Sequence, residues 1–159
     1  MQATIHSRGR RDPAGIKPGR ERGETSALAE ALDRVGDRWT LLVVEALLDG
    51  PQRFGDLQAA LPGIAPNVLT QRLRHLEREA LVAARPYSRR PPRFTYELSE
   101  SGAELAGALR LLADWGARQT DEVEPLHHER CGTALEARWW CPSCQVVVDD
   151  DDAGDAELV

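Results

Sequence analysis

Apolar residues recur at the spacing of one helix face along most of the chain, and this periodicity predicts five helices. Gly, Pro and short polar residues separate these segments and supply the caps and breaks expected at helix ends. The chain is therefore predicted to be mainly helical. The predicted helices span residues 25–36, 38–49, 54–61, 66–79 and about 103–120.

Two short segments after the fourth helix have the composition of strands instead. Residues 81–84 and 93–98 are rich in apolar, aromatic and β-branched side chains, and Pro86 to Pro92 is predicted as the loop between them. A short helix, a tight Pro62-Gly63 turn, a second helix and a basic hairpin follow one another as in a winged helix-turn-helix. The predicted fold is therefore a mainly α winged helix-turn-helix with a small β wing.

The fourth helix has two contrasting faces. Leu69, Leu73 and Leu76 form an apolar stripe, whereas polar and basic side chains fall on the opposite side at about 100° per residue. An α-helix fits the major groove of B-DNA, where amide side chains pair with adenine and Arg with guanine. A solvated face without a partner is the alternative, but the arginine-rich hairpin beyond this helix favours DNA. The residues predicted to contact duplex DNA are Asn67, Thr70, Gln71, Arg72, Arg74, Arg89, Arg90 and Arg93.

The charge is distributed unevenly, which reconciles a net charge of −6 with a nucleic-acid partner. Residues 65–99 hold seven Arg against three Glu, whereas residues 149–159 hold six acidic side chains and no basic one. No apolar run approaches the roughly 18 residues that span a bilayer, and residues 1–24 lack the apolar stretch of a signal peptide. A cytoplasmic protein without a membrane partner is expected.

Composition divides the chain into four parts. Residues 1–24 form a basic arm and residues 149–159 an acidic tail, and both are expected to be disordered because they hold too few apolar side chains to fold. Residues 25–120 hold the winged helix-turn-helix, and residues 121–148 a cysteine-containing segment. The acidic tail is most simply a solubilising extension, with competition against DNA for the basic patch as the alternative.

All three cysteines fall in residues 121–148, in two pairs of metal-ligand spacing. His128 and Cys131 form an H-x-x-C pair, and Cys141 and Cys144 form a C-x-x-C pair after nine intervening residues. Each such turn aims two ligands at one point, and three thiolates with one imidazole suit a closed, structural Zn²⁺ site. The segment resembles a small zinc ribbon with a hairpin at residues 137–148, and Zn²⁺ is the predicted cofactor.

Several alternatives to this zinc site remain open. His127 in place of His128 would leave a less usual spacing to Cys131. Cys141 and Cys144 could instead form a reversible disulfide that acts as a redox switch, or all three cysteines could be plain free thiols. A hybrid is a zinc site whose oxidation releases the metal and signals to the rest of the protein.

Three segments carry a resemblance to a known family. Gly36-Asp37-Arg38-Trp39-Thr40-Leu41-Leu42, residues 50–57 and residues 61–77 closely resemble the HxlR-type regulators, and the match continues to about residue 118. The resemblance implies a homodimeric winged-helix regulator that binds near promoters, often as a repressor that responds to small reactive metabolites or redox stress. It also implies dimerisation through the first and last helices of the domain.

The last helix supports such a dimer independently, because it carries an apolar stripe that a small domain does not fully cover. The alternative is that the stripe packs only on its own domain. A two-fold dimer would place its recognition helices about 34–36 Å apart. The residues predicted at the dimer interface are Leu28, Leu32, Leu105, Leu109, Leu112 and Trp115.

The chain departs from the family pattern at three points. Ala65 stands where a capping Ser or Asn is common, and Ala80 where Gly is usual, so both departures concern helix ends. Redox-sensing members carry a Cys near the start of the domain, whereas no Cys precedes Cys131 here.

The leading hypothesis is a sequence-specific, dimeric transcriptional regulator. An enzyme is not expected, since no nucleophile with a base and no Gly-rich phosphate loop is present and the predicted metal site is closed. The alternatives are a zinc-ribbon module that docks on transcription machinery through Trp139 and Trp140, and a thiol-based redox sensor.

Overall fold

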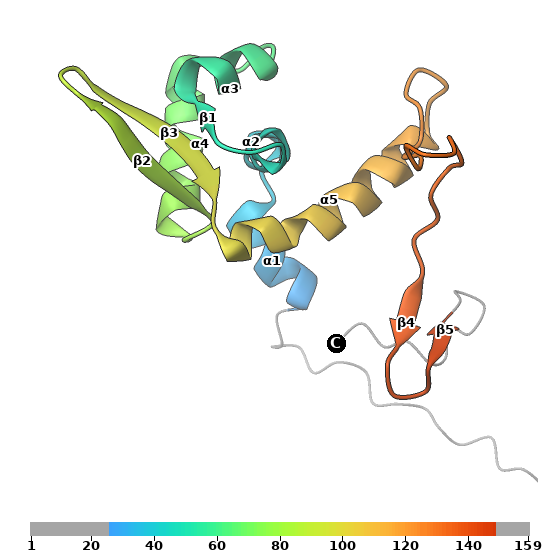
Figure 1. The fold of residues 1–159 in the computed structure, drawn as a ribbon. Coiled ribbons are helices and arrows are strands. Elements are labelled where there is room, and N and C mark those ends of the chain that lie inside the picture. The colour runs from blue at the N-terminus through green and yellow to red at the C-terminus, as the bar shows by residue number, and fades with distance from the viewer. Residues whose placement is uncertain (1–25, 149–159) are drawn as a thin grey trace, which may run out of the picture.

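The computed structural model describes residues 26–148, so the predicted basic arm and acidic tail lie outside the described residues. Figure 1 shows α2, α3 and α4 gathered beside the β2–β3 hairpin, while α5 leads away toward a separate β4–β5 hairpin. The predicted mainly helical fold with a small wing is confirmed. In chain order the elements are α1 (Ala27–Val35), α2 (Arg38–Leu48), β1 (Gln52–Arg53), α3 (Phe54–Ala60), α4 (Pro66–Arg78), β2 (Val82–Arg89), β3 (Pro92–Leu98), α5 (Glu100–Ala117), β4 (Trp139–Cys141) and β5 (Val146–Val148).

The core lies where α2, α3 and α4 meet the start of β2. The apolar stripe predicted on α4 is embedded in it, since Leu69, Leu73 and Leu76 are each at most 1% exposed. Burial of a Leu side chain contributes about 1.5–3 kcal/mol, so these three positions fix the rotation of α4 about its axis. The other buried apolar residues of this cluster are Val35, Val43, Val44, Leu47, Leu57, Leu61, Ile64, Leu81 and Val82.

The sheet has the strand order β1-β3-β2, with both pairings antiparallel. β1 is too short to show a strand pattern in the sequence, and it forms because Gln52 pairs with Tyr96 of β3. The wing strands are longer than predicted: most of the expected loop at residues 86–92 is strand, and only Arg90 and Pro91 connect Arg89 to Pro92. Pro86 lies on an edge strand next to a shift in register, which is the kind of position where sheets tolerate proline.

The N-terminus of α5 is held against the end of α4. Ser99 caps α5 by accepting the Gly102 N–H at 3.0 Å, and its hydroxyl donates to the Ala80 carbonyl at 2.7 Å. A Cβ at Gly102 would lie 2.1 Å from the Leu81 carbonyl oxygen, so only glycine permits this approach. α5 ends at Ala117, slightly before the predicted end. Among the described residues, no helix is long and apolar enough to cross a membrane.

Helix α4 ends in a left-handed residue that is not glycine. The Leu81 N–H donates to the Leu76 carbonyl at 2.9 Å and the Ala80 N–H to the Glu77 carbonyl at 3.1 Å, which is the hydrogen-bond pattern of a Schellman motif. Ala80 itself has φ 57°. This conformation costs an L-residue with a Cβ about 1–2 kcal/mol, and glycine avoids that cost.

Replacement of Ala80 by glycine is therefore expected to stabilise the protein. We expect Ala80→Gly to raise the free energy of unfolding by roughly 0.5–1 kcal/mol, because relief of the left-handed strain exceeds the entropy cost of glycine. Ala103→Gly, on an exposed position of α5, is the control and should lower it by roughly 0.5–1 kcal/mol. Urea unfolding of both variants measures the two values, and a loss of stability in Ala80→Gly would contradict this account of the helix end.

Candidate nucleic-acid interface

The side of α4 opposite the core presents the predicted recognition face. Asn67, Gln71 and Arg74 are exposed, as burial of the Leu stripe on the other side requires. Thr70 is half-buried, and its hydroxyl donates to the Pro66 carbonyl at 2.8 Å, which ties it to its own helix. Ala65, the N-cap residue of α4, makes no side-chain hydrogen bond to the helix. The next residue, Pro66, has no N–H and so leaves no donor unpaired in the first turn.

Arg72 is turned away from this face, although it was predicted to contact DNA. Its Nε lies 3.4 Å from Oδ1 of Asp37. This contact is an ion pair only, because the buried Nε has no hydrogen-bond partner among the described residues. Asp37 is also the N-cap of α2 and accepts the Trp39 and Thr40 N–H groups at 3.0 and 3.1 Å. Arg72 therefore joins α4 to the start of α2.

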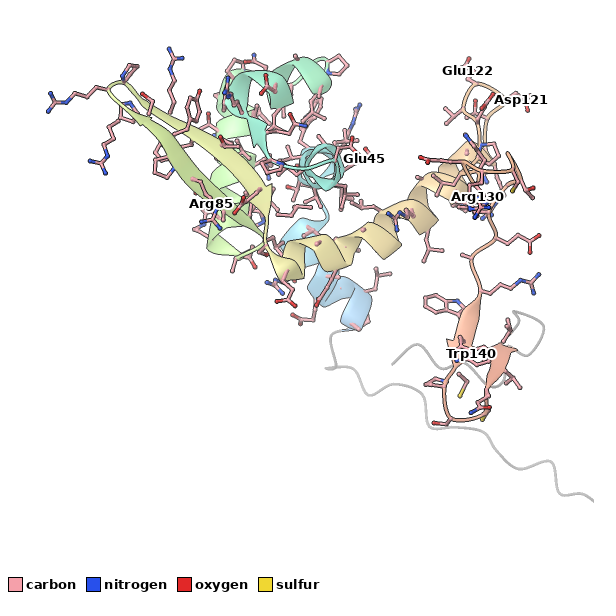
Figure 2. All side chains as sticks on the ribbon, viewed as in Figure 1. Glu45, Arg85, Asp121, Glu122, Arg130 and Trp140 are labelled. Atoms are coloured by element: carbon pink, nitrogen blue, oxygen red, sulfur yellow. The ribbon has the colours of Figure 1, made fainter. Side chains whose placement is uncertain are left out.

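The wing carries the remaining predicted contacts. Arg89, Arg90 and Arg93 are exposed at the tip of the β2–β3 hairpin, which Figure 1 shows projecting away from α5. Arg85 lies further down β2, as labelled in Figure 2, and forms an ion pair with Glu97 that offsets its charge. The hairpin tip thus gathers positive charge without an acidic partner among the described ion pairs.

One arginine beside the wing was not predicted. The Arg53 guanidinium lies 4.8 Å from the ring centroid of Tyr87, a cation–π contact between β1 and the wing. Arg53 and Arg93 line the same hollow of about 330 Å³ between α3 and the hairpin. Local sequence patterns carry no signal for this arrangement, because it depends on the pairing of β1 with β3.

Polar contacts fasten α1 to the end of α4. Arg34 Nε donates to the Glu79 carboxylate at 2.8 Å, and a second nitrogen of Arg34 donates to the Glu79 carbonyl at 3.1 Å. The hydrogen bond from Arg34 holds the pKa of Glu79 below its ordinary value. His75 Nε2 lies 2.7 Å from the Arg34 carbonyl oxygen, so His75 is also part of this contact.

The predicted dimer residues divide into two groups. Leu105 and Leu109 pack against the core of their own domain. Leu28 and Leu32 of α1 are 68% and 53% exposed, and Leu112 and Trp115 of α5 are 54% and 57% exposed. The half of the stripe near the start of α5 therefore packs within the chain, and the half near its end stays more than half exposed.

The predicted zinc ligands lie in two separate pairs. His128 Nδ1 lies 3.3 Å from Cys131 Sγ, and hydrogen bonds with the side chain and the backbone of Thr133 lower the pKa of Cys131. Hydrogen bonds from Cys144 to Cys141, first from its backbone N–H, likewise lower the pKa of Cys141. Figure 2 places Arg130, next to Cys131, near the end of α5 and Trp140 on the hairpin. Within residues 26–148 no three His, Cys, Asp or Glu side chains converge on one metal position.

Comparison with known proteins gives matches to transcriptional regulators. A family model described as HxlR-like helix-turn-helix matches residues 34–124. The HTH-type transcriptional regulator Rv3095 of Mycobacterium tuberculosis is 37% identical over 127 residues, which cover 77% of this chain and 80% of Rv3095.

Solved structures agree with these matches. The crystal structure of the HTH-type transcriptional regulator YtcD, a Bacillus subtilis protein, aligns with a TM-score of 0.57 at 34% identity and covers 62% of this chain and 100% of YtcD. The redox regulator HypR in its reduced form aligns with a TM-score of 0.56 at 30% identity and covers 59% of this chain and 93% of HypR. All three cysteines lie beyond the matched residues 34–124.

The position of Asp37 between two helices makes it a test of how α4 is held. Asp37→Ala removes the N-cap of α2 and leaves the buried Nε of Arg72 without a charge partner, so we expect it to lower the free energy of unfolding by about 1–2 kcal/mol. Asp49→Ala, at the exposed end of the same helix, should change it by less than about 0.5 kcal/mol. Equal effects in urea unfolding would show that Asp37 has no special role.

Proposed function

Because the chain belongs to the HxlR-like helix-turn-helix family and is a DNA-binding transcriptional regulator rather than an enzyme, we propose that it is a homodimeric repressor. It reads base edges with the exposed face of α4 and holds the DNA backbone with the wing. The observation that carries this proposal is that exposed Asn67, Gln71 and Arg74 stand directly opposite the buried Leu stripe of α4. A repressor occupies its site near a promoter and lowers transcription from it.

The chemistry of each group supports this division of roles. Amide side chains such as those of Asn67 and Gln71 pair with adenine in the major groove, and Arg74 can pair with guanine. Arg89 and Arg90 are at the hairpin tip, where they meet phosphates rather than base edges. Arg72 is left out of the proposed interface, because its Nε faces Asp37.

The homodimer is supported by uncovered apolar side chains on two helices. Leu28 and Leu32 of α1 and Leu112 and Trp115 of α5 are each more than half exposed. On each helix the two side chains are three or four residues apart and share one face, and exposed apolar faces of this kind mark surfaces that bind a partner. A two-fold dimer formed through them would place two copies of α4 on successive turns of the same face of the duplex, about 34–36 Å apart.

A response to thiol oxidation is the second candidate, since HypR is named a redox regulator. In this chain the signal would enter through Cys131, Cys141 and Cys144, which lie after α5, and not through the DNA-binding domain. Footprinting of the protein on the DNA upstream of its own gene, with and without a thiol oxidant, tests this response. Protection that persists under oxidation excludes the redox response and leaves the repressor proposal unaffected.

The two halves of the interface should respond differently to substitution. We expect Gln71→Ala to lose about 1–3 kcal/mol of discrimination between the cognate site and a site changed at one base pair. We expect Arg89→Ala and Arg90→Ala to weaken binding to all sequences and to reduce the slope of log K against log salt by about 1 each. Fluorescence anisotropy with short duplexes at several salt concentrations measures both quantities.

The matched control is Arg110→Ala, which removes an exposed arginine of α5 away from the wing and should leave the salt slope unchanged. If Arg89→Ala and Arg110→Ala have the same slope as the unaltered chain, the wing does not contact phosphates. The sign of regulation is checked with a transcriptional reporter. If the protein is a repressor, Gln71→Ala should raise transcription of the reporter while the variant stays folded.

The dimer surface makes a separate prediction. Leu112→Ala removes an apolar side chain twice per two-fold dimer, and each buried Leu contributes about 1.5–3 kcal/mol, so the dimer Kd should rise by roughly 100-fold or more. Leu111→Ala, on a neighbouring face of α5, should keep the dimer. Sedimentation equilibrium measures both constants, and a monomeric unaltered chain or an unchanged Kd in Leu112→Ala would refute this interface.

A further inference from the structure

Two turns in the C-terminal segment have the same backbone geometry. In the first, the Gly132 N–H donates to the His128 carbonyl at 2.8 Å; in the second, the Gln145 N–H donates to the Cys141 carbonyl at 2.8 Å. The fifth residue of each turn is left-handed, with φ 69° at Gly132 and φ 58° at Gln145. A left-handed glutamine is unusual, so the second turn is held in this shape although its sequence does not favour it.

Each turn brings its first and fourth side chains together. His128 Nδ1 and Cys131 Sγ are 3.3 Å apart in the first turn. Two ligands of one tetrahedral zinc ion, with Zn–N of about 2.0–2.1 Å and Zn–S of about 2.3 Å, lie roughly 3.6 Å apart, so this pair is close to the spacing that zinc requires. In the second turn Cys141 and Cys144 are in hydrogen-bond contact. Both turns therefore hold two donors of a metal site in advance.

The segment that carries these turns has no core of its own. Residues 121–140 are all exposed, and among residues 141–148 only Cys141 and Val148 are partly covered. A groove of about 490 Å³ separates the segment from α5 and is lined by Leu111, Leu126, Leu135 and Trp139. Folded segments shorter than about 40 residues usually need a disulfide, a metal or a partner to hold them.

We propose that one Zn²⁺ ion joins the two turns of a single chain through His128, Cys131, Cys141 and Cys144. Residues 135–138 between the turns are neither helix nor strand and are exposed, so this connector can bend without loss of regular structure. Metal sites of this kind form together with the fold around them, so the two pairs converge when the ion binds. Four protein ligands close the site to water, and its role is structural.

The turn geometry also selects His128 over His127 as the fourth ligand. The backbone of His127 pairs with Ala134 in an isolated β-bridge just outside the turn. His128 is the first residue of the turn, and its imidazole is the one that lies beside Cys131. His127 therefore serves as a matched control in an experiment on the same full-length chain.

The test is metal binding by the full-length chain after reduction and removal of metal. We expect one Zn²⁺ per chain, and titration with Co²⁺ should give the absorption bands of a tetrahedral site with thiolate ligands. His128→Ala, Cys131→Ser and Cys144→Ser should each weaken binding by on the order of 100-fold or more, because loss of a group that merely orients a ligand already costs roughly 10–100-fold. His127→Ala should bind as the unaltered chain does.

A second measurement reports on the segment itself. Zn²⁺ should slow trypsin cleavage after Arg138, in the connector, for the unaltered chain and for His127→Ala but not for Cys144→Ser. The proposal is overturned if the reduced chain binds no Zn²⁺, or if His128→Ala and Cys131→Ser keep the affinity of the unaltered chain. It is also overturned if a mixture of His128→Ala and Cys144→Ser chains regains binding, since the site would then be shared between two chains. None of these readouts depends on DNA binding.

Discussion

Burial of the apolar stripe of α4 is the constraint on which the rest of the DNA-binding domain depends. Leu69, Leu73 and Leu76 are almost fully enclosed by α2, α3 and the start of β2. Because side chains have fixed directions around a helix, this burial requires the opposite face, which carries Gln71 and Arg74, to be exposed to solvent. The exposure of the proposed recognition face therefore follows from packing on the other side of the helix.

Polar contacts place the neighbouring helices around this core. Arg72 pairs with the N-cap Asp37 of α2, and Arg34 of α1 pairs with Glu79 just beyond α4. Such pairs contribute little stability when exposed, but each brings two particular residues of neighbouring elements together. The lowered pKa of Glu79 shows that its charged form is favoured in the folded protein, so the hold on α1 is present at neutral pH and weakens as the pH falls through that lowered value.

The C-terminal segment obtains its order differently from the DNA-binding domain. The domain has a closed apolar core, whereas residues 121–140 expose every side chain and rely on turns, a bridge and a short hairpin. α5 connects the two parts, with its first half packed on the core and its second half uncovered. The half of α5 that carries the proposed dimer surface therefore lies outside the core and lines a groove together with the C-terminal segment.

The sequence by itself determined the helices, the two faces of α4 and the spacing within the two pairs of proposed zinc ligands, because each of these depends on residues a few positions apart. Tertiary structure decided features that depend on distant partners. Gln52 and Arg53 become a strand only beside β3, and Leu105 is covered while Leu112 is not, although both belong to one periodic stripe. The contact of Arg72 with Asp37 also depends on a distant partner. Periodicity predicts how side chains are spaced around a helix, but only the folded chain determines which residues they contact.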